Sequence, residues 1–294
     1  MPIVNFGSIN LDFVYRVERL VRPGETVQAM GQELFSGGKG FNQSVALARA
    51  GASVRHVGRV GEDGRWLVDA LEAEGIQTDA VEYGNTPTGH AIIQVDSQGE
   101  NNILVYGGAN LEITTSAIEQ ACAALENSDW VLLQNETNAT AQVMRIVGER
   151  GNPIVLNPSP MEASLLDLPL ASVHTFIINR SEGEALSGER EPKRILDRLA
   201  QRYPRASIVL TLGDRGALFA RENLRLEVPA ERADAVDTTG AGDTFAGYFL
   251  AEISAGSEPL PALQLACRAA AHCVTQPGAS PSIPHRAQLD SGHA

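Results

Sequence analysis

The feature that most constrains the fold of this 294-residue chain is an alternation of short apolar segments with helical patterns. Each apolar segment is hydrophobic on both faces, as a strand inside a covered parallel sheet requires. The segments are residues 54–60, 130–134, 154–157, 175–178 and 208–212, and the helical patterns are residues 66–74, 115–125, 139–149 and 193–202. This rhythm predicts an α/β protein with a doubly wound, mostly parallel sheet flanked by helices.

Two segments, residues 11–35 and 88–106, break this rhythm. They alternate polar and apolar residues like two-faced antiparallel strands, with turn signals at Arg22-Pro23-Gly24 and Ser97-Gln98-Gly99. Neither segment is expected to be stable alone, so we predict that they pair into one small antiparallel sheet. The sequence contains no repeat or linker, so we expect one domain over residues 1–294 that includes this sheet.

Composition excludes several classes of function. A hydrophobic content of 43% is enough for a sizeable core, and a net charge of −13 argues against nucleic acid and anionic membranes as partners. Cys122, Cys267 and Cys273 lack a CxxC spacing and are expected to be buried thiols in a reducing compartment. The sequence shows neither a signal-peptide pattern nor an apolar run of membrane-spanning length, so we expect a cytoplasmic protein.

Residues 235–245 carry the strongest chemical signal. They have the pattern of a strand end, a loop of small residues and a helix start. The backbone N–H groups of Gly240, Ala241 and Gly242 can approach an anion closely, and a Val at position 242 is predicted to block that approach and to strain the loop. Asp243 stands at the same place, where it is suited to take a proton from a nucleophile. The alternative is an ordinary aspartate N-cap.

A second glycine loop spans residues 36–43 and precedes a helical run that ends at Gly51. It is not a Walker A loop, because Glu33 replaces the first glycine and Gly40 the Ser/Thr after the lysine. The dinucleotide fingerprint is also absent after the first strand, which argues against a dehydrogenase. Lys39 and Asn42 remain as hydrogen-bonding side chains, a pattern that favours a polyhydroxylated ligand.

Seven segments in this order resemble the motifs of the ribokinase family of sugar and nucleoside kinases, over the whole length of the chain. They are residues 7–12, 38–42, 58–64, 179–182, 211–216, 237–243 and 274–282. The resemblance implies ATP-dependent phosphoryl transfer to a primary hydroxyl of a small sugar, on a ribokinase-like fold in which the small sheet is a lid. Ribose, giving ribose 5-phosphate, is the leading acceptor.

The resemblance also implies roles for individual residues. Asp243 is expected to be the general base, and Gly240, Ala241 and Gly242, with the N–H of Asp243, the anion hole. The implied sugar contacts are Asn10, Asp12, Gly38, Lys39, Asn42, Glu136 and Asp243. The implied nucleotide contacts are Asn179, Thr211, Gly213, Asp214, Gly216 and Gly242. Asn179 and Glu182 are implied to organise Mg²⁺ through water. The implied site for a monovalent cation, K⁺, comprises Asp237, Thr239, Cys273, Gln276, Gly278 and Ser282.

Several of these residues also have a purely structural explanation. Asp12 also suits a turn, Lys39 a solvated surface, and Glu136, Asn179 and Glu182 the start of a helix.

The chain departs from the family pattern at three places. Phe41 replaces a small residue near the sugar, Gln276-Pro277 replaces a basic pair, and Cys267 replaces a polar or imidazole side chain near the nucleotide. Two alternatives to a ribose kinase therefore stay open. One is a kinase for another sugar, a sugar acid or a nucleoside. The other is a non-catalytic regulator that binds sugar or nucleotide, which the intact Asp243 and its glycine loop disfavour.

The small sheet has too little core of its own. Its outer face is predicted to carry Ile92 or Ile93, Val95, Ile103 and Val105. Apolar surface of this kind is covered either by the main domain and the sugar or by a second subunit. The resemblance implies a homodimer formed through the two lids, with Asp12 of each lid facing its own active site.

Overall fold

The computed structural model describes residues 1–290, and within them the strands form one sheet of nine strands and one of four. The order in the large sheet is β13-β12-β11-β10-β9-β8-β1-β4-β5. Its strands are β1 (Ile3–Phe6), β4 (Val54–Gly61), β5 (Gln77–Gly84), β8 (Trp130–Leu133), β9 (Ile154–Leu156), β10 (Val173–Asn179), β11 (Ser207–Thr211), β12 (Ala217–Arg221) and β13 (Leu224–Val228). The neighbouring strands β5, β4, β1, β8, β9, β10 and β11 are parallel, whereas the β11–β12 and β12–β13 pairings are antiparallel. The predicted doubly wound, mostly parallel sheet is confirmed.

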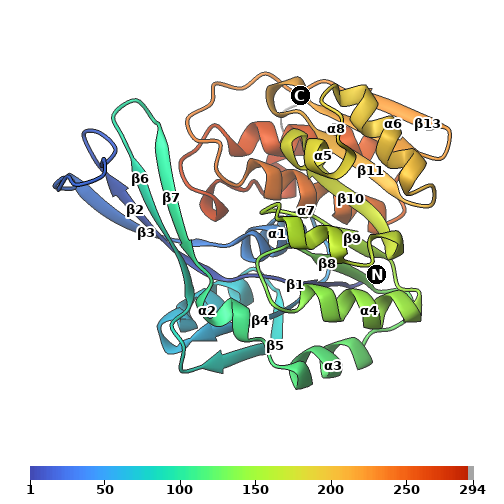
Figure 1. Ribbon diagram of the computed structural model, residues 1–294, viewed down its shortest axis with the longest axis horizontal. Helices are drawn as coiled ribbons and strands as arrows, with labels where there is room; N and C mark the ends of the chain where they lie inside the picture. Colours follow the sequence, from blue (N-terminus) through green and yellow to red (C-terminus); the bar gives the residue numbers. More distant parts are fainter. Residues whose placement is uncertain (291–294) are drawn as a thin grey trace.

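Helices cover both faces of the large sheet (Figure 1). One hydrophobic core contains side chains of α1 (Lys39–Arg49), α2 (Arg65–Ala73), α7 (Ala241–Ser254), α8 (Pro259–Cys273) and α9 (Arg286–Asp290). The other contains side chains of α3 (Thr115–Ala123), α4 (Thr140–Arg150), α5 (Arg180–Ser187) and α6 (Pro192–Arg202). Alternate residues of β8 enter the two cores, Leu132 the first and Val131 and Leu133 the second. This explains why the strands are apolar on both faces.

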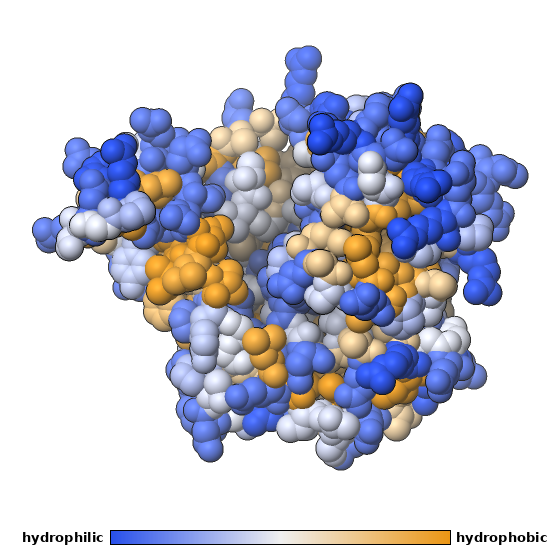
Figure 2. Space-filling view, in the orientation of Figure 1, coloured by the Kyte–Doolittle hydropathy of each residue, from blue (hydrophilic) through white to orange (hydrophobic). Residues whose placement is uncertain are grey.

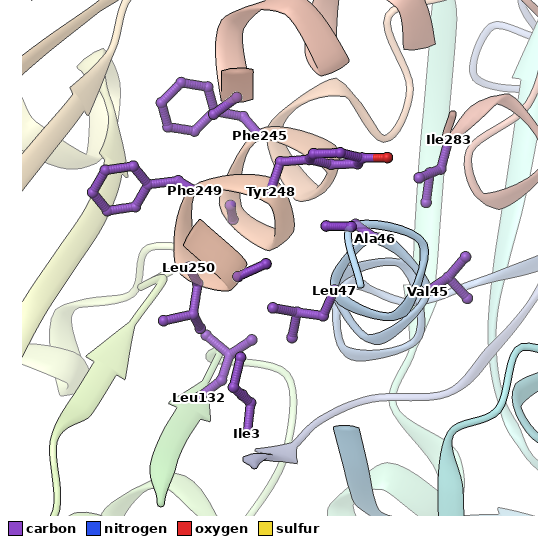
Figure 3. Close-up of a cluster of buried hydrophobic side chains, with 14 of the residues drawn as sticks. Ile3, Val45, Ala46, Leu47, Leu132, Phe245, Tyr248, Phe249, Leu250 and Ile283 are labelled. Carbon is purple, nitrogen blue, oxygen red and sulfur yellow. The ribbon is translucent and has the colours of Figure 1, made fainter. Parts of the chain in front are cut away.

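Helices α1 and α7 pack directly against each other over the sheet. Figure 3 shows Tyr248 and Leu250 of α7 beside Ala46 and Leu47 of α1. A Cβ atom at Gly247 would lie 2.4 Å from Cβ of Ala46, so only glycine permits this close approach. The contact places the N-termini of the two helices side by side.

The small sheet projects from the main body (Figure 1). Its strands are β2 (Asn10–Arg16), β3 (Gly31–Gly37), β6 (Gly89–Val95) and β7 (Asn101–Tyr106), in the order β3-β2-β6-β7. The predicted pairing of segments 11–35 and 88–106 is confirmed. The two outer pairings are antiparallel and the central β2–β6 pairing is parallel, because residues 17–88 return the chain to the same end of the sheet.

The prediction for the outer face of this sheet is wrong for most of its residues. Ile93, Val95, Ile103 and Val105 lie on the same face as Asp12 in the strand register. The opposite face carries Phe13, Leu34, Ile92 and Leu104. Alternation in a strand fixes which residues share a face, but it does not fix which face points outward.

The strand end predicted before the glycine loop is also wrong. Residues 229–240 contain no strand after β13, and Val236 is 67% exposed. The backbone N–H of Val236 donates to Val274 at the end of α8. This segment therefore docks on the main body rather than in the sheet. Within residues 1–290, no helix is both long and apolar enough to span a membrane.

Candidate active site

The predicted catalytic and sugar-contact residues gather where α1 and α7 begin, beyond the carboxyl ends of β1 and β8. In open α/β sheets this edge is where ligands bind. Figure 2 shows the surface hollowed between the small sheet and the main body. At Gly40 a Cβ atom would lie 2.4 Å from Cα of Gly7, so the start of α1 is pressed against the end of β1.

Asp243 lies in the first turn of α7 and is 7% exposed. The N-cap residue is Gly240, in the left-handed conformation, and no side chain caps the helix. The carboxylate of Asp243 instead accepts hydrogen bonds from Asn42 Nδ2 at 3.1 Å and Gln43 Nε2 at 2.8 Å. The carboxylate thus serves the start of α1 rather than its own helix, so the N-cap alternative does not describe it.

The other implied sugar contacts surround Asp243. Glu136 accepts from Ser8 Oγ and from the backbone N–H of Lys39, and Asn10 Oδ1 accepts from Asn110 Nδ2 at 2.7 Å. Gly38 has a φ of 88°, which a side chain rarely adopts. The helix-start interpretation of Glu136 is therefore incomplete, because its carboxylate bridges residues 128 and 97 positions away in the sequence.

Asp12 enters the same group from β2. Its carboxylate lies over Gly37 of the paired strand β3, where a Cβ atom would come within 2.1 Å of Asp12 Oδ2. Burial, together with the nearby charges of Glu136 and Asp243, raises the pKa of Asp12 to about 7. Asp12 is thus not simply a turn residue.

Lys39 is the cation of this group. The negative charge of Asp243 raises the pKa of Lys39, and Glu136 and Glu182 act in the same direction. The surplus of carboxylates over cations means that protonation of one carboxylate relieves repulsion in the site.

Stability is expected to depend on pH through Asp12. Its folded pKa of about 7 lies above the reference value of 3.8, so the folded chain holds an extra proton between these values. The free energy of unfolding should therefore fall as pH rises from about 4 to 7. Asp12→Asn should flatten this slope and stabilise the ligand-free protein at pH 8 by roughly 1–3 kcal/mol. Urea unfolding of both proteins from pH 4 to 8 measures the difference, and parallel curves would contradict the assignment.

In the glycine loop at the start of α7, the backbone N–H of Ala241 already has an acceptor, whereas Gly242 faces open space. The N–H of Ala241 donates to Thr238 at 3.3 Å in a turn. Gly242 is exposed, and a Cβ atom built on it would meet nothing within 4 Å. The first N–H groups of a helix lack intrahelical acceptors, and the helix dipole adds positive potential there. The start of α7 can accordingly hold an anion beside Asp243.

The predicted Mg²⁺ residues form the capping box that was their structural alternative. Asn179 accepts from the backbone N–H of Glu182 at 2.9 Å, and Glu182 accepts from the backbone N–H of Asn179 at 2.9 Å. Glu182 is only 3% exposed, and burial raises its pKa. Its charge nevertheless reaches Lys39. The pair is therefore tied to the same site while it also starts α5.

The predicted nucleotide loop follows β11. Gly213 and Asp214 are exposed, and Thr211 is partly buried. Gly216 is buried, and a Cβ atom on it would lie 2.0 Å from the carbonyl oxygen of Val228. The need for glycine at position 216 thus has a structural cause in the contact with the end of β13.

The two segments predicted to hold a monovalent cation lie against each other behind the glycine loop. Asp237 accepts from the backbone N–H groups of Thr239 and Gly278, each at 2.9 Å. Cys273 Sγ lies 3.0 Å from Ser282 Oγ and 3.8 Å from the Thr239 carbonyl oxygen. Gln276, by contrast, is exposed. In residues 1–290 no group of three or more His, Cys, Asp or Glu side chains could hold a metal ion.

Two of the three departures from the family pattern are buried in the core. Phe41 is 2% exposed and packs in the first hydrophobic core, against which Phe13 of the small sheet also packs. Cys267 is 6% exposed in the same core. Both side chains are therefore part of the hydrophobic core.

Sequence reasoning missed several residues of this site, notably Gln43, Asn110, Gln134 and Asn157. Gln43 is fully buried and donates to both Asp243 and Asn157. Asn110 binds Asn10 and the backbone of Ile9. The available signal was the position of Gln43 directly after Asn42 in the glycine loop. Its partner lies 200 residues away and could not be read locally.

Fold and site together define a kinase-like protein, in which a buried carboxylate stands beside a helix N-terminus that can hold an anion. The sequence pattern of the pfkB family carbohydrate kinases matches residues 2–286. The chain belongs to this family and is a carbohydrate kinase.

Three relatives illustrate the similarity. Ribokinase of Staphylococcus aureus is 33% identical over 293 residues, which cover 96% of each chain. Deoxyribokinase of Salmonella typhi is 31% identical over 299 residues, covering 99% of this chain and 98% of the relative. A structure of Arabidopsis thaliana ribokinase complexed with ribose and ATP has a TM-score of 0.85 and 32% identity, covering 99% of this chain and 97% of that one.

Proposed function

We propose that this protein transfers the γ-phosphoryl group of ATP to the primary hydroxyl of ribose, forming ribose 5-phosphate. One observation carries the proposal: the carboxylate of Asp243 is held at the N-terminus of α7 by the side chains of Asn42 and Gln43 of α1. A base and an anion-binding helix end at one place are what phosphoryl transfer to a hydroxyl requires.

In this proposal the sugar binds between the small sheet and α1. Asn10, Asp12, Lys39, Asn42 and Glu136 hold its hydroxyl groups. Asn42 Oδ1 is buried and has no hydrogen-bond partner among residues 1–290, so it can accept from a sugar hydroxyl. Asp243 takes the proton of the attacking hydroxyl, and the N–H groups at the start of α7 stabilise charge on the transferred phosphoryl group.

ATP is proposed to extend from the start of α7 along the loops after β10 and β11, past Asn179, Thr211 and Asp214. Asn179 and Glu182, at the start of α5 after β10, are proposed to hold a Mg²⁺ ion through water, because their side-chain oxygens are of the kind that Mg²⁺ prefers. Mg²⁺ would supply charge neutralisation for the phosphates. The buried thiols Cys122, Cys267 and Cys273 fit a reducing compartment, and we propose the cytoplasm.

Ribose is favoured by the ribokinases at about 33% identity and by the Arabidopsis structure, which holds ribose and ATP. The second candidate is deoxyribose, because a deoxyribokinase is 31% identical over nearly the whole chain. A coupled assay of ADP release across ribose, deoxyribose, fructose and nucleosides tests the choice. Ribose should give the highest kcat/KM. Higher kcat/KM with another acceptor would reassign the substrate, and saturable sugar binding without turnover on any acceptor would favour the regulator.

A monovalent cation is expected to increase activity. Asp237 accepts from the backbone N–H of Gly278, and Cys273 Sγ contacts both the Thr239 carbonyl oxygen and Ser282 Oγ. Cα of Ala279 lies 3.0 Å from the position of a Cβ atom on Gly240. A cation bound there would support the N-terminus of α7 from behind. Turnover should be severalfold higher in KCl than in NaCl of equal ionic strength. Equal rates in the two salts would count against a selective site.

We also propose that the small sheet is a lid and that the protein dimerises through it. Strand β7 is exposed along its length, with Ile103 at 51%, Leu104 at 67% and Val105 at 57%. These residues contribute to an apolar area over β7 in Figure 2. An open strand edge with this much apolar surface requires a cover.

Sedimentation should give a dimer mass for the wild type. The double variant Ile103→Glu/Leu104→Glu places charge on both faces of β7 and should sediment as a monomer with weaker sugar binding. Asn102→Glu adds charge to the same strand without removing apolar surface, and it should remain dimeric. A fully active wild-type monomer at micromolar concentration would refute the dimer.

A further inference from the structure

A continuous chain of buried polar side chains runs from Asp243 into the core. It leads from Gln43 of α1 to Gln134 after β8, then to Asn5 of β1, Ser44 and His56. All five are at most 1% exposed. Such a network is costly to bury unless its hydrogen bonds are made, so its geometry is informative.

His56, at the inner end of this hydrogen-bond network, fixes which group donates and which accepts in each of its hydrogen bonds. His56 Nε2 lies 3.1 Å from the carbonyl oxygen of Gly7, which can only accept, so Nε2 carries the proton. Burial lowers the pKa of His56 to about 4, so the ring is neutral and Nδ1 is an acceptor. The hydroxyl of Ser44, 2.8 Å from Nδ1, must then donate to it.

The amide orientations follow from this end. Because Ser44 donates to His56, its oxygen accepts from Asn5 Nδ2 at 2.8 Å. The carbonyl oxygen of Asn5 then accepts from Gln134 Nε2 at 2.9 Å. The same Gln134 nitrogen donates to Gln43 Oε1 at 2.8 Å. Flipping any one amide would place two donors or two acceptors together.

At the other end of the network, these orientations make the Gln43 amide nitrogen the group that faces Asp243. Gln43 Nε2 must point away from Gln134, and its two N–H groups donate to Asp243 Oδ1 at 2.8 Å and Asn157 Oδ1 at 2.9 Å. Asn157 is itself fixed by donating to the carbonyl oxygen of Ile177 at 2.9 Å. The second oxygen of Asp243 is shared with Asn42, the proposed sugar contact.

We propose that Gln43 is a positioning residue, whose core-anchored amide holds the Asp243 carboxylate in the orientation required for proton transfer. The proposal rests on the proposed function, in which Asp243 is the base. Gln43 is fully buried and lies behind Asp243, so it acts on the reaction through that carboxylate and makes no contact with the sugar. Substitutions at Gln43 should therefore lower the rate of phosphorylation without weakening the binding of the sugar.

Two variants remove the donor. Gln43→Met keeps the length of the side chain without its amide, and Gln43→Leu removes both the length and the polarity. Each should lower kcat about 10–100-fold, as expected for a lost hydrogen bond to a charged group, while sugar affinity by calorimetry stays within about 3-fold. Asn152→Leu is the control, because Asn152 is a buried amide that donates to the carbonyl oxygens of Glu126 and Asp129. It should lose stability and keep kcat.

The decisive measurement combines Gln43→Leu with Asp243→Asn, at enzyme concentrations that make the residual turnover measurable. If Gln43 acts through Asp243, the double variant should be no slower than Asp243→Asn alone. If the fold-losses in kcat of the two single variants multiply in the double variant, the positioning role is overturned. It is also overturned if both Gln43 variants keep wild-type kcat while Asp243→Asn is inactive. Wild-type turnover in Asp243→Asn would instead refute the proposed base itself, so the two failures are distinguishable.

Discussion

Asp243→Asn is expected to lower kcat by about 10²–10⁴-fold while leaving sugar affinity within a few-fold. The substitution keeps the size of the side chain and removes its ability to accept a proton. The fold should tolerate it, because the amide has the shape of the carboxylate and its oxygen can still accept from Gln43 Nε2. The loss should therefore appear in the chemical step rather than in folding.

Steady-state kinetics with ATP and ribose, together with calorimetry of ribose binding, separate the two effects. Asp197→Asn is the matched control, since Asp197 pairs with Arg225 on the surface and should keep full activity. Near wild-type turnover in Asp243→Asn would show that another group accepts the proton. Loss of ribose binding at the same magnitude as the loss of kcat would show that Asp243 is chiefly a binding residue.

The parts of the fold that are encoded locally could be predicted from the sequence. Strands buried on both faces appear as continuous apolar runs, and the helices between them follow a 3.6-residue period, so the parallel sheet followed directly. The convergence of Asn42 and Asp243 was predictable only from the resemblance to known kinases. These two residues lie 201 positions apart in the sequence, on two different helices, and no local pattern encodes their contact.

What the sequence could not provide are properties of packing. The alternation in β7 placed Ile103 and Val105 on one face, but only the strand register shows that Asp12 shares it. Similarly, small residues at 240–242 indicated a close approach without showing which backbone bears a positive φ. The structure places that conformation at Gly240, with a φ of 79°, so the strain predicted for a side chain at Gly242 is absent.

The network behind Asp243 illustrates the same limit. Asn, Gln, Ser and His side chains are common on protein surfaces, and nothing in their spacing marks Asn5, Gln43 or His56 as buried. Their burial follows from the packing of β1 beneath α1, which brings Asn5 to Gly40 and Ser44. A polar residue in a strand or helix pattern becomes informative only when its partners are known.

Gly242→Val is expected to lower kcat by about 10²–10³-fold while ribose affinity and the melting temperature change little. A Cβ atom at this position would meet no other part of the protein within 4 Å, and Gly242 is exposed at the start of α7. The proposed phosphoryl group occupies that space, so the added methyl groups should exclude it. Kinetics should show the loss, calorimetry should show intact ribose binding, and Gly242→Ala should give a smaller loss.

Gly240→Val is the contrasting variant, and it makes the Gly242 prediction specific. At Gly240 the backbone has a φ of 79° and a Cβ atom would lie 3.0 Å from Cα of Ala279, so Val should strain the loop and lower the melting temperature. Two glycines separated by one residue at the start of α7 should thus respond differently: Gly242→Val should lose turnover, and Gly240→Val should lose stability. If Gly242→Val instead unfolds the protein or abolishes ribose binding, the position is structural. If it keeps wild-type turnover, the phosphoryl group lies elsewhere and the start of α7 is not the anion hole.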